Sequence, residues 1–178
     1  AGMYGRSYVG ATRALDDFVL CTDFRAMNEN RGKFMDLAFA EAEAAAAAGE
    51  VPIGAVLVDN KSGEVLAAAG NRVESDFDPT AHAELLAIRF ASAKRNSPRL
   101  GECDLYVTLE PCPMCAQAIS FARIRRLYFG AFDAKGGGVE NGPRIFSQTS
   151  CHHRPEVYGG MNEMRAAELL RTFFSDRR

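Results

Sequence analysis

The sequence predicts an α/β fold in which a mixed sheet of about five strands carries helices on both faces. Short apolar runs of strand length alternate with longer segments of helical periodicity, and most links between them are short. The chain has 178 residues, which is enough for one domain to bury a sizeable core without disulfides or other staples. We therefore expect a single folded α/β domain.

The first part of the chain lacks this pattern. Residues 1–33 mix Gly, Ser, Asp, Arg and Asn without sustained periodicity, and Ala1 and Gly2 before Met3 resemble a cloning remnant. We predict that residues 1–33 are a poorly ordered N-terminal extension or a cloning-derived segment. The folded domain is then expected to span residues 34–178.

The folded domain should begin with a helix and a hairpin. Residues 34–48 are rich in alanine and glutamate, show helical spacing of apolar positions, and are followed by Gly49 as a stop signal. Two short apolar runs, residues 54–58 and 65–69, are joined by a polar link that contains glycine. This arrangement predicts an antiparallel β-hairpin.

The middle of the chain predicts two helices and two strands, in the order helix, strand, helix, strand. Thr80 precedes an apolar periodic run and is expected to cap a helix of about residues 81–94. Residues 104–109 and 127–131 read as strands, with a helix over residues 112–122 between them. Short links of this kind imply right-handed crossovers and parallel neighbours. Helix N-termini should then meet the carboxyl ends of strands, the usual place for a site in such sheets.

Residues 132–155 form the longest irregular stretch. Glycine and proline residues punctuate it, and a loop of this length in a compact domain is more often functional than idle. A short strand at residues 156–158 and a helix over about residues 162–176 complete the predicted fold.

Two short motifs carry the chemistry. His82-Ala83-Glu84 lies in the first turn of one predicted helix, and Cys112 and Cys115 bracket the start of the other. Cysteines at positions i and i+3 share a helix face, and the helix dipole lowers their pKa toward the thiolate form that zinc binds. One imidazole and two thiolates leave a tetrahedral zinc with one position for an activated water. Glu84 is not needed as a ligand and is the candidate proton carrier.

Two alternative interpretations of the cysteine pair stay open at this point. A Cys-x-x-Cys pair can be redox active, although the strand context of such pairs is missing here. A closed structural zinc site would need a fourth ligand, and it would give Glu84 no role. The candidate fourth ligands are Cys103, Cys151, His152 and His153.

The two motifs together resemble a known family. His-Ala-Glu followed by Pro-Cys-Pro-Met-Cys is similar to the signature of the cytidine and deoxycytidylate deaminase superfamily. Further matching segments resemble the bacterial tRNA-specific adenosine deaminases within it, and the resemblance extends from about residue 34 to the C-terminus. These segments are residues 51–58, 71–72, 78–84, 105–112 and 129–135.

The resemblance implies a three-layer cytidine-deaminase-like fold and a zinc-dependent deaminase domain over residues 34–178. It implies one Zn²⁺ per chain, held by His82, Cys112 and Cys115, with Glu84 as the catalytic residue. The implied reaction is hydrolytic conversion of adenosine to inosine at the wobble position of a tRNA anticodon, by a homodimer. A deaminase of a free base or nucleoside, such as guanine or cytidine, is the alternative, and a non-catalytic zinc-stabilised module is a third.

The resemblance also implies substrate contacts. Asn71 would read the base, although an asparagine there also suits a turn. Val51 would line the base pocket, and Asp133 would meet the nucleotide before the target. Phe174 and Arg177 match a C-terminal element that packs on the anticodon loop, with burial in the helix core as the alternative for the phenylalanine.

The amino-acid composition restricts the kind of RNA binding and the cell compartment that we expect. The net charge of −2 excludes a protein that coats RNA non-specifically, because such a protein should be strongly basic, so any RNA contact should be local. The basic run of residues 123–126 and the pair His152-His153 are either RNA contacts or ordinary surface features. Five cysteines, no signal peptide pattern and no apolar stretch near 18 residues predict a reduced, cytoplasmic protein without a membrane segment.

Overall fold

The structure is a computed structural model that describes residues 31–175 and residue 177. The chain divides into two units, Ala1–Lys33 and Phe34–Arg178, and the second carries all the strands described below. The predicted extension over residues 1–33 lies outside the described residues except for residues 31–33. These three residues are helical and begin the first described helix, which spans residues 31–47.

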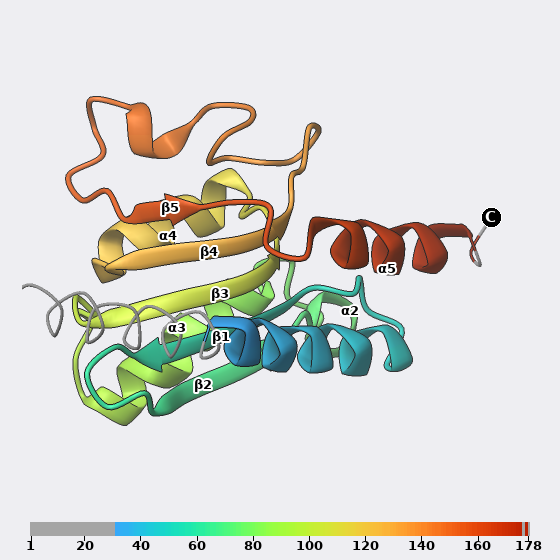
Figure 1. Ribbon diagram of the computed structural model, residues 1–178, viewed down its shortest axis with the longest axis horizontal. Coiled ribbons are helices and arrows are strands. Elements are labelled where there is room, and N and C mark those ends of the chain that lie inside the picture. Colours follow the sequence, from blue (N-terminus) through green and yellow to red (C-terminus); the bar gives the residue numbers. More distant parts are fainter. Residues whose placement is uncertain (1–30, 176, 178) are drawn as a thin grey trace, which may run out of the picture. The chain divides into compact units, whose positions relative to one another are not determined.

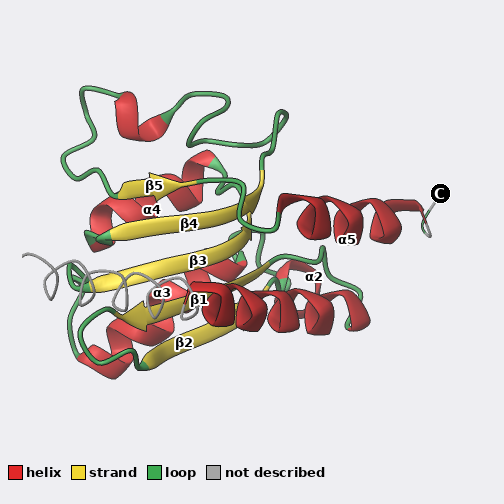
Figure 2. Cartoon of the chain, viewed as in Figure 1, coloured by secondary structure: helices red, strands yellow, loops and turns green. Residues whose placement is uncertain are grey.

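A five-stranded mixed sheet forms the centre of the fold and confirms the predicted α/β class (Figures 1 and 2). The hairpin prediction is confirmed, since β1 (Gly54–Asp59) pairs antiparallel with β2 (Val65–Gly70). On its other side β1 pairs antiparallel with β3 (Cys103–Leu109). The strands β4 (Arg126–Ala131) and β5 (Glu156–Tyr158) continue the sheet parallel to β3, giving the order β2-β1-β3-β4-β5.

This topology brings distant segments to one edge of the sheet. Because β2, β3 and β4 run in the same direction, Asn71, Glu110 and Phe132, which follow them, lie at the same edge. Ile53, which precedes the antiparallel β1, lies there as well. We call this the carboxyl edge of the sheet, and the other one the opposite edge.

The helices agree with the prediction, except that one helix begins later than predicted and one short helix was not predicted. Helices α3 (Ala83–Arg95), α4 (Pro113–Ala122) and α5 (Glu163–Ser175) lie where expected, whereas the four-residue helix α2 (Val73–Asp76) was not predicted. The predicted cap at Thr80 is wrong. Its N–H and hydroxyl both donate to Asp78 Oδ1, so the turn closes before the helix and α3 begins later, with His82 at the N-cap position.

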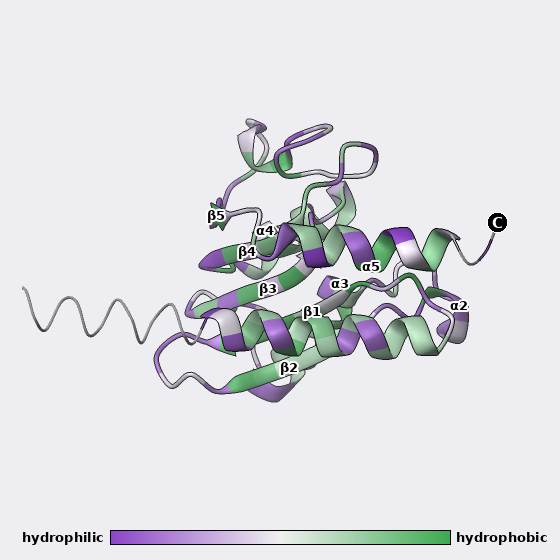
Figure 3. Cartoon of the chain, turned by 45° about the vertical axis from the view of Figure 1, so that its right-hand side comes forward, coloured by the Kyte–Doolittle hydropathy of each residue, from purple (hydrophilic) through white to green (hydrophobic). Residues whose placement is uncertain are grey.

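Two hydrophobic cores lie on the two faces of the sheet. Successive strand residues point to opposite faces, so that Ala55 and Leu57 contribute to one core and Val56 and Val58 to the other. Helices α3 and α4 cover the first face, while the helix of residues 31–47 and α5 cover the second. Figure 3 shows the apolar strands between helices that alternate polar and apolar residues. This is the three-layer arrangement predicted from the sequence.

The long segment of residues 132–155 is irregular as predicted, apart from a single 3₁₀ turn, η1 (Ile145–Ser147). Phe146 in this turn is buried in the core beneath α4. Among the described helices, none has the length and apolar character needed to cross a membrane.

Candidate active site

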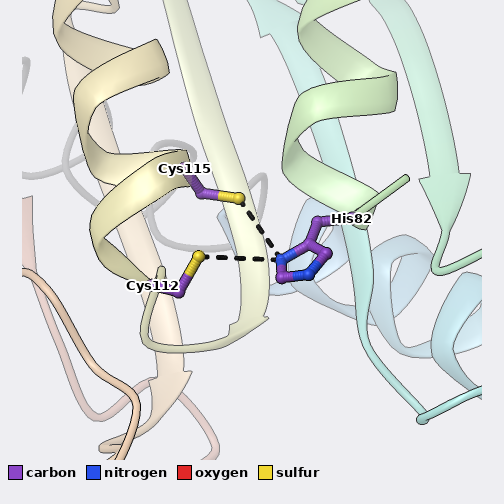
Figure 4. Close-up of side chains that lie close together, drawn as sticks. All are labelled: His82, Cys112 and Cys115. Atoms are coloured by element: carbon purple, nitrogen blue, oxygen red, sulfur yellow. Dashed lines mark hydrogen bonds between the residues drawn. The ribbon is translucent and has the colours of Figure 1, made fainter. Parts of the chain in front are cut away.

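Three predicted metal ligands meet at the carboxyl edge of the sheet (Figure 4). His82 occupies the N-cap of α3, Cys112 occupies the N-cap of α4, and Cys115 follows in the first turn of α4. The Nδ1 atom of His82 lies 3.6 Å from the sulfur of Cys112 and 3.6 Å from the sulfur of Cys115. The three ligand atoms all lie within 4.8 Å of one another.

This geometry fits zinc. Zn–S bonds of about 2.3 Å and Zn–N bonds of about 2.0–2.1 Å at a tetrahedral angle place nitrogen and sulfur about 3.6 Å apart, which is the separation observed here. Within residues 31–175 and 177, no fourth histidine, cysteine or carboxylate joins the group. The fourth protein ligand that a closed structural site would need is therefore not found among these residues, and a zinc ion held here would have one position for water.

The two thiols differ in their protonation. A hydrogen bond from Cys115 lowers the pKa of Cys112 to about 4, with a further contribution from His82. The pKa of Cys115 is raised, because its S–H donates to Cys112 and because it is buried. In the metal-free protein these shifts favour a thiolate at Cys112, and binding of zinc would require Cys115 to release its proton as well.

Glu84 lies beside this group without a hydrogen-bond partner for one oxygen. Its side chain is only 3% exposed, and its Oε2 atom accepts no hydrogen bond from any described residue. Burial raises the pKa of Glu84 to about 7. A carboxyl group that titrates near neutral pH can both accept and release a proton, as a general base and acid must.

Asn71 connects the end of β2 to the turn that carries His82 and Glu84. It is buried, and its Oδ1 accepts a hydrogen bond of 2.9 Å from the N–H of Ala83, the residue between His82 and Glu84. No other hydrogen bond of its side chain is formed within the described part of the chain. Asn71 therefore holds the first turn of α3 and leaves its amide nitrogen for another partner.

Two buried carboxylates organise this edge, and the sequence analysis missed both. Glu50 accepts hydrogen bonds from the N–H of Glu74 and from the N–H and hydroxyl of Ser75, and so fixes α2. Glu110 accepts bonds from the segment that follows β4. The signal that could have revealed Glu110 is a charged residue between a buried strand and the cysteine turn.

The other predicted substrate contacts lie around this edge and on α5. Val51 is half-buried just before β1, and Asp133 is half-buried two residues after β4. Phe174 is 51% exposed on α5. Arg177 lies over the ring of Phe173, 3.9 Å from its centroid, and donates a 2.9 Å hydrogen bond to the carbonyl of Gly49. Its guanidinium therefore already has protein partners.

The basic run of residues 123–126 and the pair His152-His153 were the remaining candidates for RNA contacts. They lie at the opposite edge of the sheet. Arg125 pairs with Asp104 at 2.6 Å, and Arg126 pairs with Glu156 at 2.6 Å. His153 bonds through Nε2 to the carbonyl of Ile124, at the end of α4 remote from the metal ligands. These residues support the fold and are not brought to the site.

A three-layer α/β fold with one histidine, two cysteines and an adjacent buried glutamate defines the zinc-dependent deaminases. The family model of the cytidine and deoxycytidylate deaminase zinc-binding region matches residues 28–131. The chain belongs to this family and, within it, to the tRNA-specific adenosine deaminases. It has a zinc-binding deaminase domain, and His82, Cys112 and Cys115 are positioned to hold one zinc.

The relatives support this placement. The chain is 57% identical over 148 residues to the tRNA-specific adenosine deaminase of Agrobacterium fabrum, covering 83% of this chain and 96% of the relative. A solved tRNA:A34 deaminase, studied for A-to-I editing at the wobble position of transfer RNA, is 58% identical with a TM-score of 0.75, covering 78% and 99% of the two chains. The guanine deaminase of Nitrosomonas europaea is 26% identical with a TM-score of 0.67, covering 81% and 84%.

Proposed function

We propose that this chain is a hydrolase that converts adenosine to inosine at the wobble position of a tRNA anticodon and releases ammonia. The observation that carries the proposal is the buried Glu84 beside an open group of His82, Cys112 and Cys115. The identity of 57% to a tRNA-specific adenosine deaminase supports the choice of substrate.

The chemistry follows from the properties of these groups. Zinc, when bound, supplies an activated water at neutral pH. Glu84 accepts a proton and then delivers protons to the ring nitrogen and to the departing amine, so that adenosine and water yield inosine and ammonia. The low exposure of Glu84 keeps bulk water from competing for this proton.

We further propose four substrate contacts and one residue that supports them. Asn71 presents its free amide nitrogen to the purine edge, and Val51 provides an apolar wall of the base pocket. Asp133 meets the nucleotide before the target. Phe174 stacks on the anticodon loop, and Arg177 supports this contact by holding α5 against Gly49. The positions of Asn71, Val51 and Asp133 around the carboxyl edge support this assignment.

A direct assay tests the proposal. The purified protein is incubated with an anticodon stem-loop carrying adenosine at the wobble position, and separately with free guanine and free cytidine. Inosine in the RNA, with little ammonia from the small molecules, is the expected result. Ammonia from guanine with an unmodified stem-loop would instead favour a base deaminase, the second candidate suggested by the similarity to guanine deaminase.

We also propose a homodimer that acts in the cytoplasm. The outer face of α3 and α4 carries an apolar groove next to Phe121, which is 72% exposed. Exposed apolar patches of this kind mark interaction sites, and a second copy is the proposed partner. Replacing Phe121→Glu should shift the protein from dimer to monomer in sedimentation experiments. The groove is lined by Leu85, Ile88, Arg89, Pro98, Ala118, Phe121 and Ala122.

A further inference from the structure

The carboxylate of Glu110 accepts an unusual number of hydrogen bonds. The residue lies between β3 and the turn that carries Cys112, and it is 2% exposed. Its two oxygens accept five hydrogen bonds, all from one segment of the long irregular stretch. The donors are the N–H groups of Asp133, Val139, Glu140 and Asn141 and the side-chain amide of Asn141, at 2.7 to 3.1 Å.

The same segment also contacts the cysteine turn directly. The N–H of Gly138 donates a 2.8 Å hydrogen bond to the carbonyl of Pro111. A Cβ atom at Gly138 would lie 2.6 Å from the backbone nitrogen of Pro113, and one at Gly137 would lie 2.6 Å from the carboxylate of Glu110. Only glycine permits these approaches, so the glycine run serves close packing of the segment on the metal site.

We propose that Glu110 is a positioning residue that fastens the segment of residues 133–141 to the turn carrying Cys112, so that substrate binding and metal retention depend on one carboxylate. Asp133, a proposed RNA contact, and Cys112, a metal ligand, thereby belong to one rigid unit. The part concerning RNA rests on the proposed function, whereas the part concerning the metal does not.

The test variant is E110Q. The substitution preserves size, but it presents an NH₂ group where the N–H of Asp133 and the amide of Asn141 now donate. We expect the KM for the stem-loop to rise by about tenfold or more, with a smaller change in kcat. We also expect zinc to pass to a chromophoric chelator about tenfold faster, and trypsin to cleave more readily after the exposed Lys135.

Two further variants control the interpretation. Asp59 is another buried carboxylate that accepts backbone N–H groups, from Lys61 and Ser62, but it lies at the opposite edge. D59N should lower thermal stability and leave zinc release and KM unchanged. N141A removes one of the five donors and should change KM and zinc release in the direction of E110Q, by a smaller factor.

The outcomes separate the two proposals. A folded E110Q protein, verified by circular dichroism, that retains the wild-type KM, zinc release and tryptic pattern would overturn the role of Glu110. If the wild type does not deaminate the stem-loop, the proposed function fails. Zinc release and cleavage after Lys135 then still decide whether Glu110 fastens this segment.

Discussion

The side-chain oxygen of Asn71 lies 2.9 Å from the backbone nitrogen of Ala83, and this hydrogen bond joins the end of β2 to the turn between His82 and Glu84. The residue proposed to read the base is thus also the residue that fixes the metal ligand and the proton carrier. The proposed substrate contact and the observed hydrogen bond to Ala83 use the same side-chain amide, and the two roles can be separated by substitution.

N71A and N71D should differ in stability. Alanine leaves the N–H of Ala83 buried without an acceptor, which should cost about 1–3 kcal/mol of unfolding free energy. Aspartate keeps an acceptor at a helix N-terminus and should restore most of that stability, but it cannot donate to the purine, so turnover should fall by about tenfold or more in both variants. Thermal denaturation and inosine formation measure the two effects. Full turnover by N71D would contradict base reading through the amide nitrogen.

E84Q should lose activity without losing metal. The amide cannot carry a proton, so turnover should fall by about 100- to 10,000-fold. Because Glu84 is buried with an unsatisfied oxygen and is not among the metal ligands, stability should stay equal or increase and the zinc content should stay at one per chain. Metal analysis and a thermal melt accompany the assay. Turnover at the wild-type rate would contradict the assignment of Glu84 as the proton carrier.

Removing zinc should expose one cysteine selectively. In the zinc-loaded protein Cys112 and Cys115 are coordinated and should resist iodoacetamide. After chelation Cys112, whose pKa is lowered to about 4 by the hydrogen bond from Cys115, should be alkylated first at neutral pH. Burial raises the pKa of Cys103 to about 11, so it should stay unmodified until the protein unfolds. Peptide mass spectrometry distinguishes these sites, and equal labelling of Cys103 and Cys112 would contradict the prediction.

The neighbouring residues Phe173 and Phe174 should respond differently to alanine. Phe173 is half-buried under Arg177, so F173A should lower unfolding free energy by about 1–3 kcal/mol. Phe174 is 51% exposed, and F174A should change stability by no more than about 0.5 kcal/mol. If Phe174 stacks on RNA, F174A should raise the KM for the stem-loop about tenfold. An unchanged KM would leave α5 with a structural role alone.

Stability should depend on Asp59 in a defined pH range. Hydrogen bonds from Ser62, together with Arg95, lower the pKa of Asp59 from 3.8 to about 2. A lowered pKa contributes stability that is fully present above 3.8 and is lost as pH falls through about 2. The difference in unfolding free energy between wild type and D59N should therefore be constant above about pH 5 and shrink below 3.8. Denaturant titrations across this range measure it, and a difference that does not vary with pH would argue against the ionised pair.

The strands and the metal ligands were predictable because their signals are local. Runs such as residues 104–109 show strand length and alternation, and the ligands His82, Cys112 and Cys115 lie in short motifs with characteristic spacing. Local signals do not reveal which backbone groups a side chain will meet after folding. Thr80 looked like a helix cap, but its hydrogen bonds to Asp78 close a turn instead.

The buried carboxylates of Glu50 and Glu110 are the main feature that the sequence analysis missed, and the reason is the same. Glu50 and Glu110 accept hydrogen bonds from residues more than 20 positions away. A charged residue next to a buried strand could have drawn attention to Glu110, but no local pattern shows which backbone groups it binds. The family resemblance assigned Arg177 to RNA, whereas its contacts with Phe173 and Gly49 depend on how α5 packs. The periodicity of the last helix predicts that packing only in outline.

Three tyrosines stack across neighbouring parallel strands on the face covered by α5. The rings of Tyr106 and Tyr128 are 4.6 Å apart, and those of Tyr128 and Tyr158 are 4.9 Å apart, both nearly parallel. The chain contains no tryptophan and only five tyrosines, so this stack should dominate its near-ultraviolet circular dichroism. The sheet thus carries an intrinsic optical signal of its own integrity. A single tryptophan introduced as F174W would add a fluorescence signal for RNA at α5 without tryptophan background from the native chain.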